Sequence, residues 1–113
     1  MDKPIPPSDV ACALVVTTVG DAETAQRIAR TLVDARLAAC VQIVPGLRSI
    51  YRWQGAVETA DEVAAIFKTT EARAGDLITH ITALHSYDVP CVVTWPIDKV
   101  LGAYADWVEG SVD

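Results

Sequence analysis

The stretch "AACVQIVPGLRSIYRWQGAVETADEVAAIFKTT", residues 38–70, decides the fold of this chain. It consists largely of residue types that favour strands, and its apolar side chains alternate with a period of two. Each half keeps one parity around a turn near Gln54–Gly55: Val41, Ile43, Leu47, Tyr51 and Trp53 before it, and Val57, Val63, Ala65 and Phe67 after it. The stretch predicts a β-hairpin with arms of about 15 residues, whereas a usual strand has about 5 or 6.

The first arm must be interrupted at Pro45–Gly46, because proline has no backbone N–H to donate to a central ladder. We expect a bulge or a bend there. Arms of this length overhang a small domain, and an exposed hairpin that carries Tyr51 and Trp53 favours aggregation unless another subunit covers it. The composition also indicates that subunits associate, because 51% of the 113 residues are hydrophobic and 21% are charged. We therefore predict a stable homo-oligomer with the hairpin as its assembly element.

The part of the chain before the hairpin predicts one strand and one helix. Residues 1–9 contain three prolines and few apolar side chains, so we expect a flexible leader followed by a single domain over residues 10–113. The β-branched run at residues 11–19 suits a buried strand. Asp21 can cap a helix that extends to about Leu37 on an amphipathic pattern.

The part after the hairpin predicts a helix, a strand and a last helix. Thr70 can cap a helix whose apolar stripe continues to Leu84. Residues 89–97, "VPCVVTWPI", predict a strand that Pro96 places at a sheet edge. An amphipathic helix started by Asp98 completes the chain. The first six elements form the βαββαβ pattern of a ferredoxin-like α+β fold, with an antiparallel sheet and both helices on one face.

Charge and hydropathy exclude several classes of protein. The net charge of -6 argues against nucleic acid as a partner, because phosphate binding needs clustered Lys and Arg. No apolar run approaches the roughly 18 residues of a membrane-spanning helix, and the first residues do not resemble a signal peptide. We expect a cytoplasmic protein without membrane contact. Cys12, Cys40 and Cys91 lie in apolar stretches without a Cys-x-x-Cys pair, which predicts buried reduced thiols.

Three charged residues in the second arm of the hairpin share one face. Glu58, Glu62 and Lys68 have the parity opposite to Val63 and Phe67. Glu62 and Lys68 are six residues apart, about 20 Å along a strand, so they cannot pair within one regular arm. A partner for Lys68 must come from another element or another chain. The alternative is a lysine that buries its stem and keeps its charged end in water.

The segment "LHSYDVPC", residues 84–91, brings together His85, Asp88 and Cys91. Their spacing suits a metal ion only if the turn curls back, and this mixture of soft and hard ligands matches no single ion well. A structural role is favoured: His85 lies near a helix C-terminus, where it can bond the last carbonyls, and Pro90 ends the turn. The sequence contains no Ser-His-Asp arrangement and no glycine-rich phosphate loop. We therefore expect no enzyme activity.

Four blocks of sequence stand out along the chain: "RLAACVQIVPGLRSIYRWQGAVE" with "EVAAIFKTT", then "HSYDVP" and "YADWV". In content and order they resemble the CutA family of divalent-cation tolerance proteins. The resemblance implies a ferredoxin-like subunit that forms a homotrimer through its long hairpins, with an architecture like that of PII signalling proteins. It also implies tolerance to copper and other divalent metals. Of the three copper ligands proposed in the family, the positions Thr17, Leu84 and His85 retain only the histidine.

We expect a ligand in a cleft shared between subunits, because concave polar sites prefer such interfaces. Its candidate residues, taken from the positions that match the family pattern and from Asp88, are Tyr51, Trp53, Glu62, Lys68, His85, Tyr87, Asp88 and Trp107. Lys68 would supply positive charge and His85 a nitrogen ligand. The ligands expected are a divalent metal ion such as copper, held by His85, or a small anion. In the alternative hypothesis the same residues only stabilise the trimer, and the effect on metal tolerance is indirect.

Overall fold

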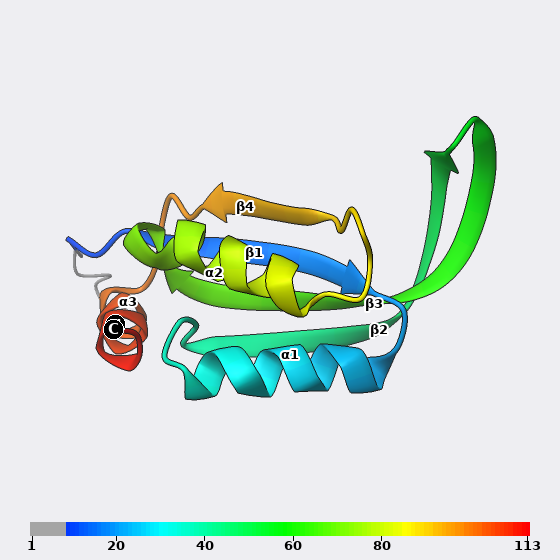
Figure 1. Cartoon of the computed structure of the whole chain (residues 1–113). Helices are drawn as coiled ribbons and strands as arrows, with labels where there is room; N and C mark the ends of the chain where they lie inside the picture. Colours follow the sequence, from blue (N-terminus) through cyan, green and yellow to red (C-terminus); the bar gives the residue numbers. More distant parts are fainter. Residues whose placement is uncertain (1–8) are drawn as a thin grey trace.

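A computed structural model of the protein describes residues 9–113, so the leader predicted over residues 1–9 lies outside the described residues apart from Asp9. Over residues 9–113 the chain folds into four strands and three helices. The elements are β1 Cys12–Val19, α1 Ala22–Asp34, β2 Cys40–Trp53, β3 Ala56–Thr70, α2 Glu71–Leu84, β4 Val92–Pro96 and α3 Gly102–Ser111. Their order confirms the predicted α+β class (Figure 1).

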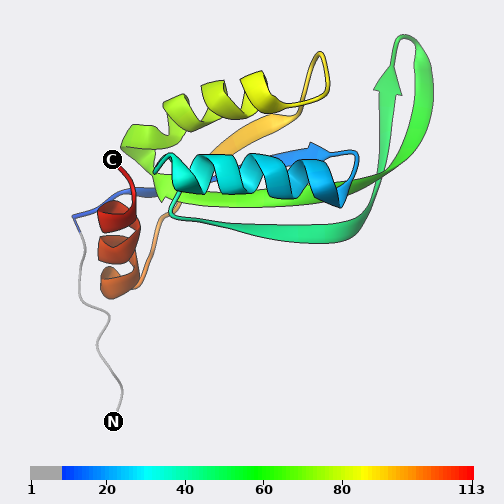
Figure 2. The ribbon, with the colours of Figure 1, turned by 60° about the horizontal axis from the view of Figure 1, so that its bottom comes forward.

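The four strands form one antiparallel sheet in the order β2-β3-β1-β4. Helices α1 and α2 lie side by side over one face of it, while α3 packs at the end of the sheet where β1 begins (Figures 1 and 2). The main core lies between the sheet and the two helices, and Phe67 and Ile28 are its largest members. This is the predicted ferredoxin-like arrangement, with β4 and its Pro96 at a sheet edge.

The long hairpin formed by β2 and β3 extends beyond the rest of the molecule and curves away from the plane of the sheet (Figures 1 and 2). Its arms have 14 and 15 residues and meet at Gln54–Gly55, where both residues have positive φ. The predicted interruption occurs at Pro45–Gly46: Val44 pairs with Ala64 and Leu47 with Glu62, so two residues oppose one. Gly46 has a φ of 82°, a left-handed conformation that favours glycine.

The prediction that the apolar residues of the first hairpin arm share one face is wrong, because the bulge divides them between the two faces of the sheet. Before the bulge, Val41 pairs with Phe67 on the core side of the sheet. After the bulge, Tyr51 pairs with Glu58, whose parity in β3 is opposite to that of Phe67. One extra residue moves every later side chain to the other face, because the side-chain period of a strand is two. The predicted parity of the first arm did not allow for the extra residue of the bulge, although a bulge was expected at Pro45–Gly46.

The helix boundaries differ from the predictions in three ways. At α1 the cap is confirmed, because Thr24 N donates to Asp21 Oδ1 at 2.7 Å, but the helix ends at Asp34 and Arg36 takes a φ of 60°. Thr70 precedes α2 without a capping hydrogen bond from its side chain. The last helix begins at Gly102 and not at Asp98. Ile97 N donates to Cys12 O, and this bond keeps the chain extended beside β1 beyond the end of β4.

The sheet face opposite α1 and α2 presents a row of apolar side chains. Along most of its length none of the helices within residues 9–113 covers this face (Figure 2). Val93 and Trp95 of β4 are exposed there, paired with Val16 and Leu14 of β1. Ile66 of β3 continues the row and is half-buried. An exposed apolar sheet face of this kind is typical of a subunit interface.

Candidate functional site

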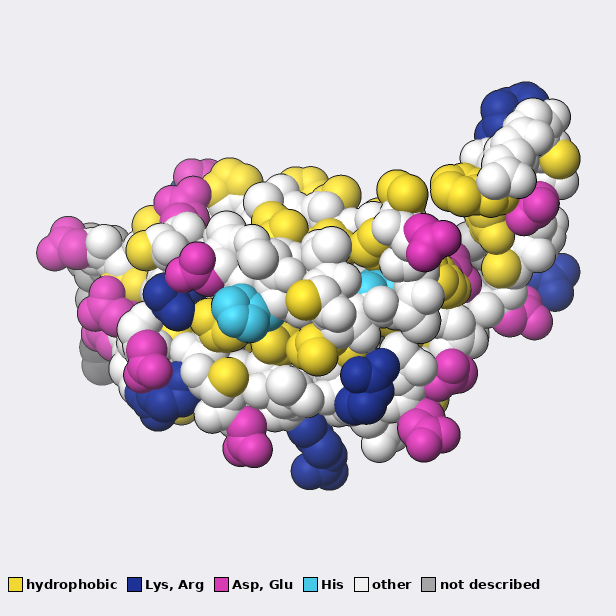
Figure 3. Space-filling view, viewed as in Figure 1, with side chains coloured by type: hydrophobic (Ala, Val, Ile, Leu, Met, Phe, Trp, Pro, Cys, Tyr) yellow, Lys and Arg dark blue, Asp and Glu magenta, His cyan; other side chains and the backbone are white. Residues whose placement is uncertain are grey.

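A cleft of about 720 Å³ lies between the hairpin and the turn that joins α2 to β4. Hydrophobic and acidic side chains gather where the hairpin leaves the body of the molecule, and a notch separates the end of the hairpin from the body (Figure 3). β1, β2, β3 and the turn all contribute to the cleft. Its lining residues are Thr18, Ser49, Ile50, Tyr51, Trp53, Glu58, Glu62, Tyr87, Asp88, Val89 and Cys91.

Glu62 is a buried carboxylate in the wall of the cleft, with 7% of its surface exposed. The hydroxyl of Tyr87 donates to Glu62 Oε2 at 2.9 Å. Oε1 makes no hydrogen bond within residues 9–113, and it is not among the fully enclosed atoms without a partner. Desolvation, and next the hydrogen bond to Glu62, raise the pKa of Tyr87 to about 12. The phenol therefore stays protonated and adds no negative charge to the cleft.

His85 fixes the turn that carries Tyr87 and Asp88. It follows the last residue of α2, and its Nε2 lies 2.8 Å from Thr18 O, while Tyr87 N donates to its Nδ1 at 3.1 Å. A carbonyl can only accept and a backbone N–H can only donate, so the ring is the neutral tautomer with its proton on Nε2. Its ring also lies 4.7 Å from that of Tyr87. Both ring nitrogens are thus occupied by backbone groups.

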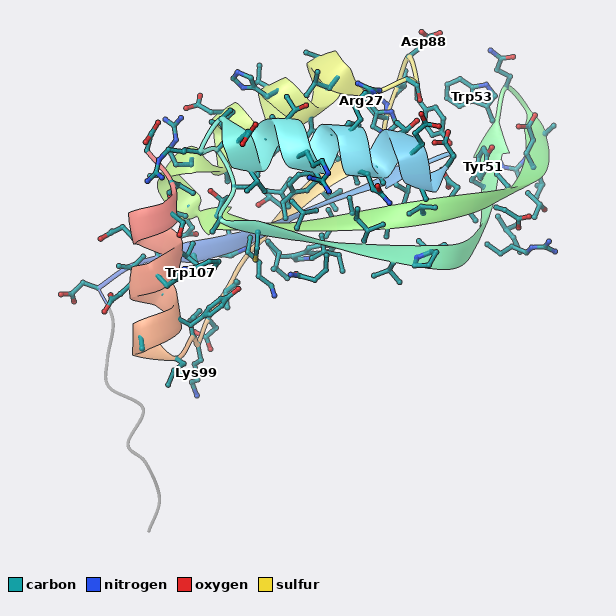
Figure 4. All side chains as sticks on the ribbon, turned by 90° about the horizontal axis from the view of Figure 1, so that it is seen from below. Arg27, Tyr51, Trp53, Asp88, Lys99 and Trp107 are labelled. Carbon is teal, nitrogen blue, oxygen red and sulfur yellow. The ribbon has the colours of Figure 1, made fainter. Side chains whose placement is uncertain are left out.

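The aromatic residues of the hairpin reach the cleft because of the bulge. Trp53 extends from β2 toward the turn that carries Asp88, and Tyr51 lies beside it on the same strand (Figure 4). Glu58, opposite Tyr51 in the ladder, also lines the cleft. Glu58 was not among the candidate residues, although its place directly across from Tyr51 follows once the bulge is counted. Thr18, Ser49, Ile50 and Val89 were also missed, and no feature of the sequence indicated them.

The prediction that all three cysteines are buried is wrong for Cys91. Its side chain is exposed at the edge of the cleft, while its carbonyl accepts a hydrogen bond from Thr17 Oγ1 at 2.7 Å. Only Cys12 is fully buried among the three, and Cys40 is partly buried. Cys91 lies in the turn before β4, because the first three residues of the predicted strand, 89–91, are not paired to β1, and so its side chain does not enter the core.

Lys68 and Trp107 lie away from the cleft within one chain. Lys68 pairs with Leu14 and Cys40 at the other end of the sheet, and its Nζ lies 5.7 Å from the centre of the Tyr104 ring. Trp107 also contacts that ring, with 5.5 Å between centroids (Figure 4). The structure therefore brings together Tyr51, Trp53, Glu62, Tyr87 and Asp88, with His85 supporting them. A cleft that adds Lys68 and Trp107 from another subunit stays a prediction.

The cleft is acidic. Glu58, Glu62 and Asp88 line it, and no lysine or arginine does so within the described part of the chain. The charge of the lining favours cations over anions. The three carboxylates do not converge on one point. Residues 9–113 contain no group of three or more His, Cys, Asp or Glu side chains arranged to hold a metal ion.

Replacing Tyr87 with phenylalanine should lower the free energy of unfolding by about 1 kcal/mol near neutral pH, because the buried carboxylate loses its donor. The pKa of Tyr87 rises from 10.0 to about 12 on folding, so its contribution is complete below pH 10 and is lost as the pH rises through 12. The difference between wild type and variant should therefore be constant up to pH 10 and then shrink. Urea unfolding at a series of pH values measures it.

Tyr51→Phe is the matched control, because the hydroxyl of Tyr51 makes no hydrogen bond within residues 9–113 although it lines the same cleft. It should leave the free energy of unfolding unchanged to within about 0.5 kcal/mol. An equal loss in both variants would show that the bond from Tyr87 to Glu62 has no stabilising role.

Comparison with known proteins gives one consistent family. The family model described as "CutA1 divalent ion tolerance protein" matches residues 13–111. The divalent-cation tolerance protein CutA of Thermus thermophilus is 47% identical over 95 residues, which are 84% of this chain and 92% of that protein. The solved structure of CutA from Archaeoglobus fulgidus, titled a periplasmic divalent cation tolerance protein, has a TM-score of 0.87 at 35% identity and covers 90% of this chain and 99% of its own.

The relatives occupy different compartments according to their names. Alongside the periplasmic protein, the chloroplastic CutA of Arabidopsis thaliana is 38% identical over 102 residues, which are 90% of this chain and 56% of that longer protein. The names describe tolerance proteins rather than enzymes. Within residues 9–113, no helix combines the length and the apolar character needed to cross a membrane.

Proposed function

Because the chain belongs to the CutA1 divalent ion tolerance family, we propose that it acts as a homotrimeric module that binds a cation in the cleft between hairpin and turn. The observation that carries the proposal is the composition of the cleft, with three carboxylates and no basic residue among its lining residues within 9–113. This lining supports a cation over the small anion that was also expected. A signalling role like that of PII proteins, exercised in the cytoplasm, remains part of the proposal.

Two surfaces support assembly into a homotrimer. One is the apolar sheet face with Ile66, Val93 and Trp95, and the other is the outer part of the hairpin. Ile50 and Val57 on the hairpin are 70% and 62% exposed, far more than is usual for large apolar side chains. Burying both surfaces between subunits would also protect the unpaired edges of the long arms.

The oxygen donors of the cleft bear on the identity of a bound metal. Carboxylates suit hard divalent cations such as Mg²⁺ or Mn²⁺ better than they suit copper. His85, the one residue retained from the copper ligands proposed in the family, uses both ring nitrogens for backbone hydrogen bonds. Copper binding by His85 would require the turn to open, so the carboxylates are the better candidates for cation contacts.

The second candidate function is purely structural. It is favoured by the hydrogen bonds of His85 and Tyr87, which hold the turn against β1 and β3 without any ligand. In that case the candidate residues stabilise the trimer, and the effect on metal tolerance is indirect.

Two measurements on the purified chain test the proposal. Light scattering should give three times the 12.1 kDa of one chain. Calorimetry with Mg²⁺, Mn²⁺, Zn²⁺ and Cu²⁺ should detect binding that the double variant Glu58→Gln, Glu62→Gln weakens, because both carboxylates line the cleft. A trimer in which no cation binds, or in which the double variant binds equally well, would favour the structural alternative.

A further inference from the structure

We propose that the cleft takes an elongated organic cation, in which ammonium or guanidinium groups are separated by an apolar carbon chain. This inference rests on the proposed function, in which the cleft binds cations, and it specifies their chemical class. It is carried by three features of the described residues: the spacing of the carboxylates, the aromatic residues that line the same cleft and the free oxygen of Glu62.

The carboxylates are spread along the cleft and do not converge on one point. Glu58 and Glu62 lie four residues apart on β3, about 13 Å along a strand, and Asp88 stands on the turn that forms the other wall. Consistent with this, residues 9–113 form no metal-binding group of three or more ligands. A single metal ion could not contact all three carboxylates, whereas an elongated cation with two or more charges can reach carboxylates that lie far apart.

Much of the remaining lining of the cleft is aromatic and apolar. Tyr51 and Trp53 come from β2 and Tyr87 from the turn, with Ile50 and Val89 beside them. Faces of Trp and Tyr attract ammonium and guanidinium groups, and they also pack against methylene groups. A hydrated divalent ion gains nothing from such a wall. The volume of about 720 Å³ is that of a site for a small organic molecule.

Glu62 provides the anchoring charge. Its carboxylate is buried, and Tyr87 occupies only Oε2, so Oε1 is left to accept a hydrogen bond from a ligand in the cleft. A charge-assisted bond in a desolvated site is stronger than the same bond in water. The single hydroxyl donor from Tyr87 does not neutralise the carboxylate, and no basic residue lines this cleft within the described chain.

Isothermal calorimetry with spermidine and agmatine as probes tests the inference, with 1,8-octanediol as a neutral chain of similar length. Both cations should bind and the diol should not. Glu62→Gln should weaken binding about tenfold or more, the usual range for a lost charge-assisted hydrogen bond. Asp106→Asn is the matched control, because it makes the same change in net charge at an exposed position on α3. It should change the dissociation constant less than twofold.

Glu58→Gln and Trp53→Leu keep the inference testable if Glu62→Gln perturbs the fold, because both residues are exposed. Each should weaken spermidine binding more than Asp106→Asn does. Equal affinity for all these variants would show unspecific attraction to an acidic chain and overturn the inference. Binding of divalent ions without binding of either organic cation would also overturn it, while leaving the proposed function intact. Failure of both kinds of cation to bind would overturn both.

Discussion

Phe67→Ala should lower the free energy of unfolding by about 3–5 kcal/mol, a large share of the stability of a chain this size. Phe67 is completely buried and is the largest of the fully buried side chains. It lies on β3 between Val15 of β1 and Val41 of β2, under both helices. Truncation leaves a cavity at the centre of the core that the surrounding strands cannot close. Urea unfolding at constant protein concentration measures the loss.

Val33→Ala provides the contrast on the surface of α1. Val33 is 38% exposed and belongs to neither of the two surfaces proposed for assembly. Its truncation should change the free energy of unfolding by less than about 0.5 kcal/mol. A loss for Phe67→Ala below about 1.5 kcal/mol would contradict the central place given to this side chain.

Ile66→Lys should convert the proposed homotrimer into monomers while each chain keeps its secondary structure. Ile66 is the neighbour of Phe67 and points to the other face of the sheet, where it lies between Val16 and Gln42. A charge placed in an apolar interface would lose its hydration without a partner, which costs several kcal/mol in each subunit. In a single chain the same lysine would reach water. Light scattering measures the mass, and circular dichroism checks the fold.

Gln26→Lys adds the same charge to the exposed side of α1 and should leave the mass unchanged. If Ile66→Lys also formed trimers, the apolar sheet face would not be the interface, and assembly would have to rest on the hairpin alone. If both variants dissociated, added charge itself would be responsible.

The sequence was sufficient to predict the fold because its main signals are local. Alternating apolar residues defined both arms of the hairpin, and Asp21 identified the start of α1. The start of α3 was predicted four residues too early, because the hydrogen bond from Ile97 N to Cys12 O is a tertiary contact that propensity does not report. The early end of α1 was missed because Arg36 takes a conformation usually left to glycine.

The site was predictable only in part. Glu62 and Tyr87 could be nominated from the sequence, but their contact could not, because 25 residues separate them. Parity placed Lys68 on the same face as Glu62, and the distance along the strand already required its partner to come from another element or another chain; within one chain the neighbour is Tyr104, which no pattern in the sequence indicated. The roles of both nitrogens of His85 depend on Thr18 O and on the path of the turn, and neither is visible in a motif.

The bulge at Pro45–Gly46 sets a rule for changes in hairpin length. Between Gly46 and Tyr51, adding or removing a single residue would reverse the phase of all later side chains and turn Tyr51 and Trp53 out of the cleft. A change of two residues would restore the phase and only lengthen or shorten the reach. Natural variants of this hairpin that keep the aromatic wall should therefore differ in this segment by even numbers of residues, or else gain or lose a second bulge.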